Sequence, residues 1–249
     1  MKKMLANLIC CFIFNKNKRH NFRKKFMNVK EFKNFSSINE LTKDLEDTKE
    51  IFTQIFNENY WGDDESVSGP GSKLENTKNL RKELPKIIKK YGIKSILDVP
   101  CGDMNWMSKV DLSNIKYYGF DIVEELIKNN SLKFSNNKNY TFQVVDAIGD
   151  ELPCVDLIIC RDLIIHFPLE AIYQLLNNFI KSDSKYLLIT ETKGIDENLE
   201  IPFGSWTYRN LRKPPFNLPE SLVFIGDHEA QSNNCGMALY RLKDIKKYI

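Results

Sequence analysis

Short apolar runs alternate with amphipathic segments from residue 95 onward. Five runs have the length and apolar character of buried strands: 95–99, 116–120, 140–145, 155–160 and 185–190. Apolar positions with helical spacing mark 123–133 and 169–180 between them. Strands that alternate with helices in this way predict an α/β domain with a doubly wound, mostly parallel sheet.

The segments on either side of this core extend the prediction. Residues 32–59 are charged and amphipathic, which favours helix, and apolar residues from Leu80 to Tyr91 recur with helical spacing. Pro85 should kink or restart the second helix, and Gly92 should end it. Two apolar runs at 221–226 and 237–242 have no clear helix between them, which predicts an antiparallel hairpin. We therefore divide the chain into an arm (1–30), a helical extension with a loop (31–75) and a domain (76–249).

Charge is distributed unevenly along the chain. The arm holds nine Lys or Arg and no Asp or Glu, which leaves 27 basic and 33 acidic residues in the rest. Residues 31–249 taken together are therefore mildly acidic, whereas a nucleic-acid-binding surface needs a basic stripe. We exclude nucleic acid as a partner of the domain. For the arm we expect an acidic partner, anionic lipid in preference to RNA.

Residues 4–14 of the arm form an apolar run of 11 residues, shorter than the ~20 needed to cross a bilayer. A basic block follows at 16–25 without a small-residue cleavage site, which disfavours export. Two interpretations stay open. The run forms an interfacial helix at the inner face of the membrane, or it packs on this domain or on a second subunit. Either way we expect a cytoplasmic protein, and the sequence leaves its oligomeric state open.

Cysteine usage agrees with a reducing compartment. The six cysteines form no CxxC pair, and their spacing suits neither zinc nor a secreted disulfide framework: Cys10, Cys11, Cys101, Cys154, Cys160 and Cys235. The sequence also lacks a P-loop and a nucleophile elbow. We therefore predict no metal site.

Acidic residues stand at the ends of three successive predicted strands. Asp98 precedes a turn around Gly102, Asp121 follows this turn at the end of the second strand, and Asp146 ends the third. Ligands of open α/β sheets bind outside the carboxyl ends of the strands, where a carboxylate can accept hydrogen bonds from ribose hydroxyls. Three carboxylates suit a cationic sulfonium cofactor better than a diphosphate. A helix cap is the structural alternative for Asp98.

Four blocks carry a more specific resemblance: YWGDDESVSGPGS (60–72), LDVPCGDMNWM (97–107), DLIICRDLIIHFP (156–168) and GSWTYRNLRKPPFNLP (204–219). Over residues 60–244 the chain resembles bacterial class I S-adenosylmethionine-dependent methyltransferases that are often linked to surface-polysaccharide tailoring. The resemblance implies a Rossmann-like, seven-stranded sheet with a C-terminal antiparallel hairpin. It also implies S-adenosylmethionine as cofactor and S-adenosylhomocysteine as product. It leaves the acceptor open, because fold does not fix substrate.

Carried over by position, the resemblance implies a cofactor site. Asp121 would bind the ribose and Asp146 the adenine amino group, while the 68–72 loop would close over the methionine moiety. A plain turn is the alternative for that loop. The residues implied to bind the cofactor are Ser68, Gly69, Gly71, Ser72, Asp98, Pro100, Cys101, Gly102, Asp121, Ile122, Asp146, Ala147 and Arg161.

Methyl transfer needs alignment of the two reactants and, for a hydroxyl acceptor, removal of a proton. We predict His166 as general base, because histidine titrates near neutral pH. Asp162 is the orienting or alternative base, and Arg161 holds an anionic acceptor or the loop. Capping of the next helix is the structural alternative for His166. The residues expected near the acceptor are Trp61, Trp106, Trp206, Tyr208, Arg209 and His228.

The leading hypothesis is O-methylation of a small molecule, such as a sugar or phosphorylated precursor of a capsule polysaccharide, and N-methylation of a small amine is a close variant. A glycosyltransferase would need a DxD-like metal site, and the acidic run at 63–65 precedes the sheet and lacks that context. A cofactor-dead scaffold held at the membrane by the arm is the non-enzymatic rival. Acidic residues at three strand ends argue against it.

Overall fold

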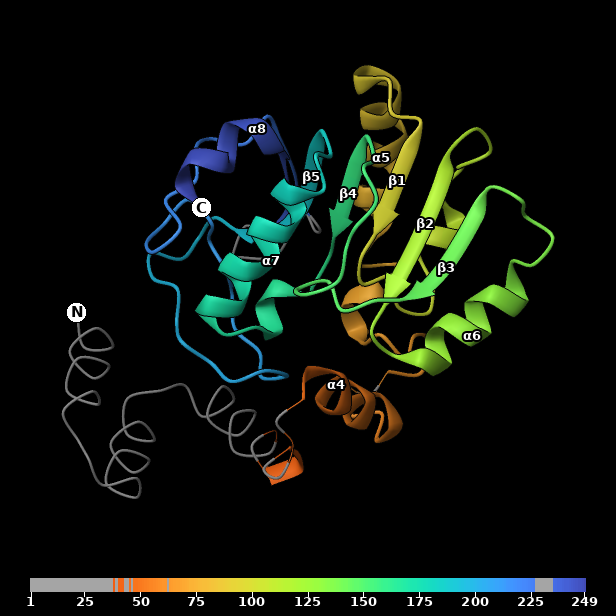
Figure 1. The fold of residues 1–249 in the computed structure, drawn as a ribbon, viewed down its shortest axis with the longest axis horizontal. Coiled ribbons are helices and arrows are strands. Elements are labelled where there is room, and N and C mark those ends of the chain that lie inside the picture. Colours follow the sequence, from red (N-terminus) through yellow and green to blue (C-terminus); the bar gives the residue numbers. More distant parts are fainter. Residues whose placement is uncertain (1–37, 39, 43–44, 46, 62, 227–234) are drawn as a thin grey trace.

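The computed structural model describes residues 38, 40–42, 45, 47–61, 63–226 and 235–249. Their strands form one sheet in the order β3-β2-β1-β4-β5-β7-β6 (Figure 1). The bounds are β1 Ser95–Asp98, β2 Lys116–Asp121, β3 Tyr140–Val144, β4 Leu157–Cys160, β5 Tyr186–Thr192, β6 Val223–Gly226 and β7 Cys235–Arg241. Strands β1 to β5 pair in parallel, and β7 is antiparallel to both neighbours. The predicted mostly parallel, seven-stranded sheet with a C-terminal antiparallel hairpin is confirmed.

Strand burial follows position in the sheet. All four residues of β4 in the middle are buried, as their uninterrupted apolar sequence requires. The edge strand β3 instead alternates between half-buried and exposed residues. One of its faces is covered by the protein and the other meets water.

Helices cover both faces of the sheet. Helix α7 (Leu169–Lys181) shares one core cluster with Leu97, Ile158 and Leu187, and α5 (Lys78–Tyr91) shares a second with Ile96 and Ile159. Neighbouring positions of one strand thus feed opposite cores, as strand geometry requires. The remaining helices are α4 Thr48–Asn57, α6 Glu124–Lys133 and α8 Leu242–Ile245, with single turns η1 Pro70–Ser72, η2 Met107–Lys109, η3 Ile164–His166 and η4 Lys246–Tyr248.

Helix α5 runs through Pro85 as one element, so the predicted restart at this proline is wrong. Leu80, Leu84 and Ile87 are buried on both sides of the proline. Their packing outweighs the backbone hydrogen bond that proline cannot donate. The helix ends at Gly92 in a left-handed conformation (φ 64°), as predicted.

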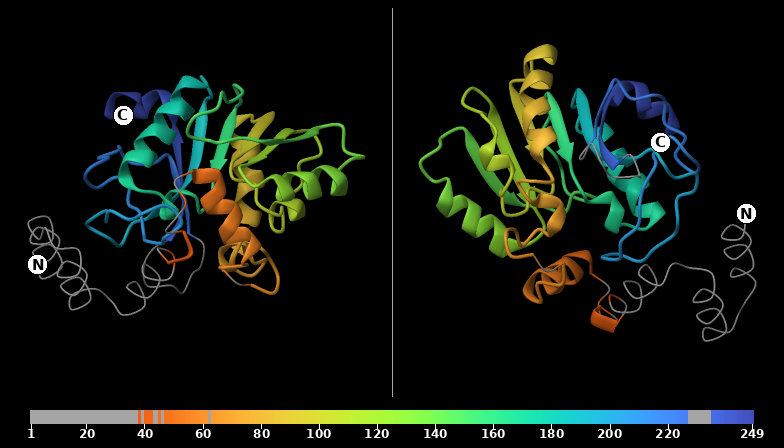
Figure 2. Two further views of the ribbon diagram at one scale, coloured as in Figure 1. Left: turned by 60° about the horizontal axis from the view of Figure 1, so that its bottom comes forward. Right: turned by 180° about the vertical axis from the view of Figure 1, so that it is seen from behind.

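Helix α4 lies below the carboxyl ends of the parallel strands in Figure 1 and crosses in front of them in the left view of Figure 2. It begins at Asp47, whose side chain accepts a hydrogen bond from the Glu50 amide at 3.0 Å. Phe52 packs against Phe167, with ring centroids 5.9 Å apart. The part of the extension that includes α4 therefore helps to enclose the sheet edge where ligands of such folds bind.

Candidate active site

A cleft of about 1070 Å³, including its open mouth, lies at the carboxyl ends of β1 to β4. We call it the strand-end cleft. Most of the predicted cofactor residues line it: Ser68, Ser72, Asp98, Pro100, Cys101, Gly102, Asp121, Ile122, Asp146, Ala147 and Arg161. The structure thus brings together residues that lie up to 93 positions apart in the sequence.

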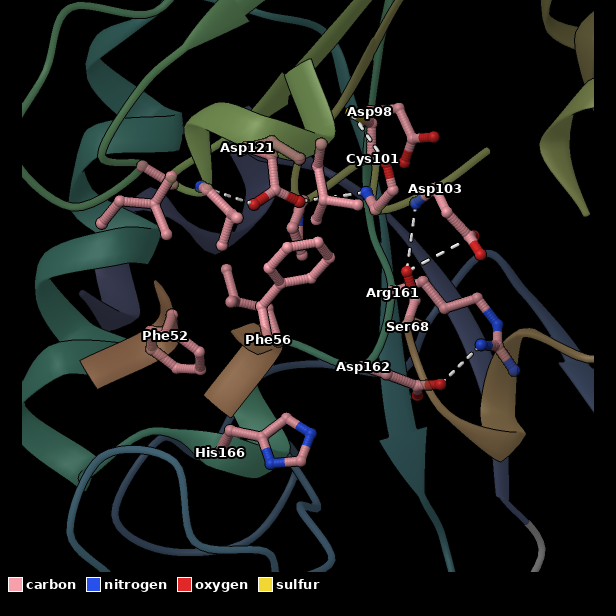
Figure 3. A pocket seen from close by; sticks show the side chains of 18 of the residues that line it. Phe52, Phe56, Ser68, Asp98, Cys101, Asp103, Asp121, Arg161, Asp162 and His166 are labelled. Atoms are coloured by element: carbon pink, nitrogen blue, oxygen red, sulfur yellow. Dashed lines mark hydrogen bonds and ion pairs between the residues drawn. The ribbon is translucent and has the colours of Figure 1, made fainter. Parts of the chain in front are cut away.

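Asp121 closes the end of β2 with both carboxylate oxygens engaged (Figure 3). Oδ2 accepts a hydrogen bond from the Gly102 amide at 3.0 Å, and Oδ1 accepts one from the Val123 amide at 3.0 Å. Burial raises the pKa of Asp121 to about 6, although these amides favour the charged form. Each oxygen keeps a second lone pair, so the carboxylate can still accept hydrogen bonds from a ligand in the cleft.

Asp98 at the end of β1 is buried and accepts a hydrogen bond from the Tyr117 hydroxyl at 2.6 Å. Burial raises its pKa to about 7, which the bond from Tyr117 only partly offsets. Asp98 is thus held by a strand neighbour instead of capping a helix.

Asp146 follows β3 and lines the strand-end cleft. Its Oδ1 accepts a hydrogen bond from the Ile148 amide at 2.9 Å. Apolar side chains that can pack on a flat aromatic base also line the cleft, and we call them the apolar sleeve: Ile122, Val123, Leu126, Val145 and Ala147. Val123, Leu126 and Val145 were missed from the sequence, since apolar residues there were indistinguishable from core.

A network of hydrogen bonds ties the 63–72 loop to the turn after β1. Asp103 accepts from the Ser66 hydroxyl at 2.8 Å, the Val67 amide at 3.1 Å and the Ser68 hydroxyl at 3.4 Å, and its own amide donates to the Ser68 hydroxyl at 3.1 Å. Asp103 also lines the cleft and was missed by sequence reasoning. The 68–72 loop is therefore a fixed wall of the cleft.

Gly102 supports the same contact between loops. It has a positive φ of 53°, and a Cβ placed on it would overlap the Ser68 hydroxyl. Glycine is therefore needed at this position because the 63–72 loop approaches the turn closely.

A second cavity adjoins the strand-end cleft on the side of β5 and the 204–210 segment. We call it the outer cavity. Five residues line both spaces and form their common wall: Trp61, Ser68, Arg161, Asp162 and His166. The outer cavity is otherwise lined by Tyr60, Gly69, Pro70, Gly71, Asn76, Ile165, Thr190, Thr192, Trp206, Tyr208 and Cys235.

Asp162 occupies the centre of the common wall. Its φ of 55° is uncommon for a residue other than glycine, although Asp tolerates it. The Asp162 amide donates to the Thr190 hydroxyl at 2.7 Å, and that hydroxyl donates to Asp162 Oδ1 at 3.2 Å. Its Oδ2 forms an ion pair with the Arg161 guanidinium (Figure 3). The carboxylate thus reaches both spaces from a fixed position.

Arg161 is buried and paired, and its guanidinium carbon lies 6.0 Å from the centroid of the Trp106 ring. Asp162 already matches the charge of Arg161, so the pair favours the second predicted role of Arg161, holding the loop, over binding of an anionic acceptor. Trp106 lines the strand-end cleft and not the outer cavity, so its predicted contact with the acceptor is not supported by its position.

His166 is buried in η3, and its Nδ1 lies 2.8 Å from the Ser205 carbonyl oxygen. A carbonyl only accepts, so Nδ1 carries the proton and Nε2 is the acceptor. The Trp61 ring stacks on the imidazole with centroids 4.6 Å apart. Burial lowers the pKa of His166 to about 4, so the ring is neutral near pH 7.

The remaining residues predicted to lie near the acceptor differ in where the structure places them. Trp206 and Tyr208 line the outer cavity and contact each other edge to face, with centroids 4.7 Å apart. Arg209 is fully buried, and its guanidinium donates to the backbone carbonyls of Ile164, Phe167 and Leu199. Its predicted role in binding the acceptor is wrong. His228 lies outside the described residues.

Helix α4 contributes three cleft residues that sequence reasoning missed: Thr48, Phe52 and Phe56. Within the described residues, no group of three or more His, Cys, Asp or Glu is arranged to hold a metal ion. The helices of this described part also include none that is long and apolar enough to cross a membrane.

The fold is similar to those of solved methyltransferases. The N-methyltransferase NodS from Bradyrhizobium japonicum WM9 in complex with S-adenosyl-L-homocysteine matches with a TM-score of 0.54 and 11% identity, over 78% of this chain and 98% of that chain. Magnesium protoporphyrin IX methyltransferase (ChlM) from Synechocystis PCC 6803 with bound SAM matches with a TM-score of 0.53 and 14% identity, over 80% and 98% of the two chains. No protein-family model and no curated protein matches the chain. At such low identity, the likeness establishes the Rossmann-like fold alone.

Proposed function

We propose that the protein is an S-adenosylmethionine-dependent methyltransferase that modifies a small molecule and binds its cofactor in the strand-end cleft. The observation that carries the proposal is the position of Asp121. Its buried carboxylate ends β2 beside an apolar sleeve, where a ribose and its base would lie in this fold.

The residues of the cleft fit this cofactor. Asp121 would hold the ribose hydroxyls, Asp146 the adenine amino group, and Ser68 the methionine end. Arg161, the one Lys or Arg among the described lining residues, is already paired with Asp162. A cationic sulfonium therefore suits the cleft better than a diphosphate, which needs unpaired cations or backbone amides.

The cofactor, when bound, supplies an electrophilic methyl group. His166 and Asp162 stand in the common wall between the two cavities, where an acceptor and a cofactor would meet. We assign proton acceptance from a hydroxyl to His166 Nε2, with Asp162 as the orienting or alternative base. Because Nδ1 donates to the Ser205 carbonyl, Nε2 keeps a lone pair that can take a proton. The low pKa of His166 keeps Nε2 unprotonated near neutral pH.

For the acceptor we propose a sugar or other small precursor of a bacterial surface polysaccharide, methylated on oxygen. The support is the resemblance of the four sequence blocks to such tailoring enzymes. N-methylation of a small amine is the alternative reaction. We further propose that the arm holds this cytoplasmic enzyme at the inner face of the membrane, on the basis of its nine basic residues and its apolar run.

Calorimetric titration of the full chain tests the proposed function. We expect S-adenosylmethionine and S-adenosylhomocysteine to bind, whereas NADH and UDP-glucose do not. Asp121→Ala should weaken both interactions by about 10- to 100-fold, because hydrogen bonds to a charged group are lost. Asp111→Ala, which removes an exposed carboxylate between η2 and β2, should leave them unchanged.

Two results would count against the proposal. If a folded sample binds neither sulfur compound, the cleft is not a cofactor site and the scaffold becomes the better explanation. If both bind but Asp121→Ala has the wild-type affinity, the ribose does not contact Asp121.

A further inference from the structure

The charged groups of the outer cavity balance one another. Among the described residues that line it, the Lys, Arg, Asp and Glu side chains are Arg161 and Asp162, and these form an ion pair. His166 is neutral because burial lowers its pKa to about 4. A phosphate or carboxylate entering this space would lose water without gaining an unmatched cation, which is costly.

The aromatic side chains of the outer cavity provide flat apolar surface. Trp206 and Tyr208 form a wall from the segment after β5, and Tyr60 and Trp61 contribute further rings. Aromatic faces carry partial negative charge, so they attract C–H groups that carry slight positive charge. The C–H face of a sugar ring has this character.

The polar groups of this cavity are mostly uncharged. Thr192 donates its hydroxyl only to the Cys235 sulfur, 3.5 Å away, which is a weak acceptor. The Thr192 oxygen can therefore accept a hydrogen bond from a ligand. Asp162 and His166 Nε2 add acceptors in the common wall. Hydroxyl groups, which both donate and accept, match such a set.

We infer that the outer cavity takes an uncharged, polyhydroxylated ring, stacked on Trp206 and Tyr208 with one hydroxyl directed to Asp162 and His166. The described lining residues offer no unmatched cation to a phosphorylated or carboxylated form of that ring, so we expect such forms to be disfavoured. This inference rests on the proposed function, and it narrows the acceptor to neutral sugars or cyclic polyols.

The test is a titration of the full chain saturated with S-adenosylhomocysteine. Three sets of titrants are used, one each for glucose, galactose and mannose. Each set contains the neutral hexose, its 6-phosphate, its uronate and its 2-amino derivative. In at least one set we expect the neutral hexose to bind at least about tenfold more tightly than all three charged relatives. Trp206→Ala should weaken that binding by at least about tenfold while the affinity for S-adenosylhomocysteine is kept. Leu132→Ala, an exposed position on α6, is the control.

The outcomes are distinguishable. Failure to bind S-adenosylhomocysteine would overturn the proposed function itself. If that compound binds, tighter binding of a phosphate, uronate or amine than of its neutral parent would overturn the inference. Absence of binding by every neutral hexose would overturn it as well. If Trp206→Ala unfolds, Tyr208→Ala serves as the second wall variant, and the wild-type ranking still decides.

Discussion

Two carboxyl groups are buried at strand ends in the cleft. Asp98 and Asp121 both have raised pKa values, about 7 and about 6, and burial is the main cause for each. A buried carboxyl that resists ionisation lowers the stability of the folded state wherever the unfolded chain ionises freely. These two residues therefore carry a cost in stability, which is common at functional sites.

Asp98→Asn should make this cost measurable. The pKa of Asp98 rises from 3.8 unfolded to about 7 folded, so below pH ~4 both states are protonated and no cost exists. As the pH rises, the unfolded state ionises first. The wild type should therefore lose up to about 4 kcal/mol relative to Asp98→Asn between pH ~4 and ~7. Urea denaturation at each pH measures the free energy of unfolding of both proteins. A difference between them that does not change with pH would contradict this prediction.

The pKa of His166 leads to a distinct kinetic prediction. Because His166 protonates only near pH 4, the rate at saturating cofactor should stay flat from pH 8 to pH 5 and fall as the pH approaches 4. His166→Ala should slow methyl transfer by about two to four orders of magnitude and leave cofactor binding intact. A titration of the wild-type rate near pH 6.5 would show that a different group takes the proton.

The residues that sequence reasoning misplaced share one property. Arg209 and Trp106 have side-chain types that suit a binding wall, but residue type does not reveal the direction in which a side chain points. Arg209 donates to the carbonyls of Ile164 and Phe167 in the turn around η3 and to that of Leu199 in the segment after β5. Such carbonyls are created by tertiary structure, so no local pattern could have shown them.

At the level of elements, the 63–72 loop positions the common wall. A Cβ placed on Gly71 would lie 2.5 Å from Asp162 Oδ2 and 3.4 Å from Arg161 Nη1. The loop therefore presses directly on the ion pair. The resemblance implied that the 68–72 loop closes over the methionine moiety, but the contact with the ion pair could be seen only in the folded structure.

Gly71→Ala tests this contact. Asp162 must move away from its bonds to Arg161 and Thr190, so we expect a loss of about 1–3 kcal/mol in the free energy of unfolding. Gly149→Ala is the matched control, since a Cβ there meets no atom within 4 Å, and it should change stability by less than about 1 kcal/mol. If urea denaturation gives the same change in the free energy of unfolding for both variants, the loop moves away from Asp162 at no cost in stability.

The sequence predicted helices and strands well where the pattern of apolar residues followed directly from which positions are buried. The strands were found because their buried runs are short and apolar, and α5 because its apolar face repeats every turn. The effect of Pro85 was overestimated, since packing at Leu84 and Ile87 is not a local quantity. The role of α4 as part of the cleft could not be predicted, because helical amphipathicity does not identify the surface against which a helix packs.

At the level of the whole molecule, charge separates the basic arm from residues 31–249, which are mildly acidic as a whole. If the arm binds anionic lipid, deletion of residues 1–27 should abolish co-sedimentation with phosphatidylserine vesicles and leave cofactor affinity unchanged. Wild-type binding should fall with added salt, because the attraction is screened. Sedimentation of the truncated chain with the same vesicles would assign membrane contact to the domain.

The common wall has a thermodynamic consequence. Trp61, Ser68, Arg161, Asp162 and His166 belong to both cavities, so a ligand that shifts any of them on one side alters the affinity on the other. Linkage makes this coupling reciprocal: if one ligand changes the affinity for the second by some factor, the second changes the affinity for the first by the same factor. Measuring the cooperativity of the two ligands would therefore report how stiff this wall is.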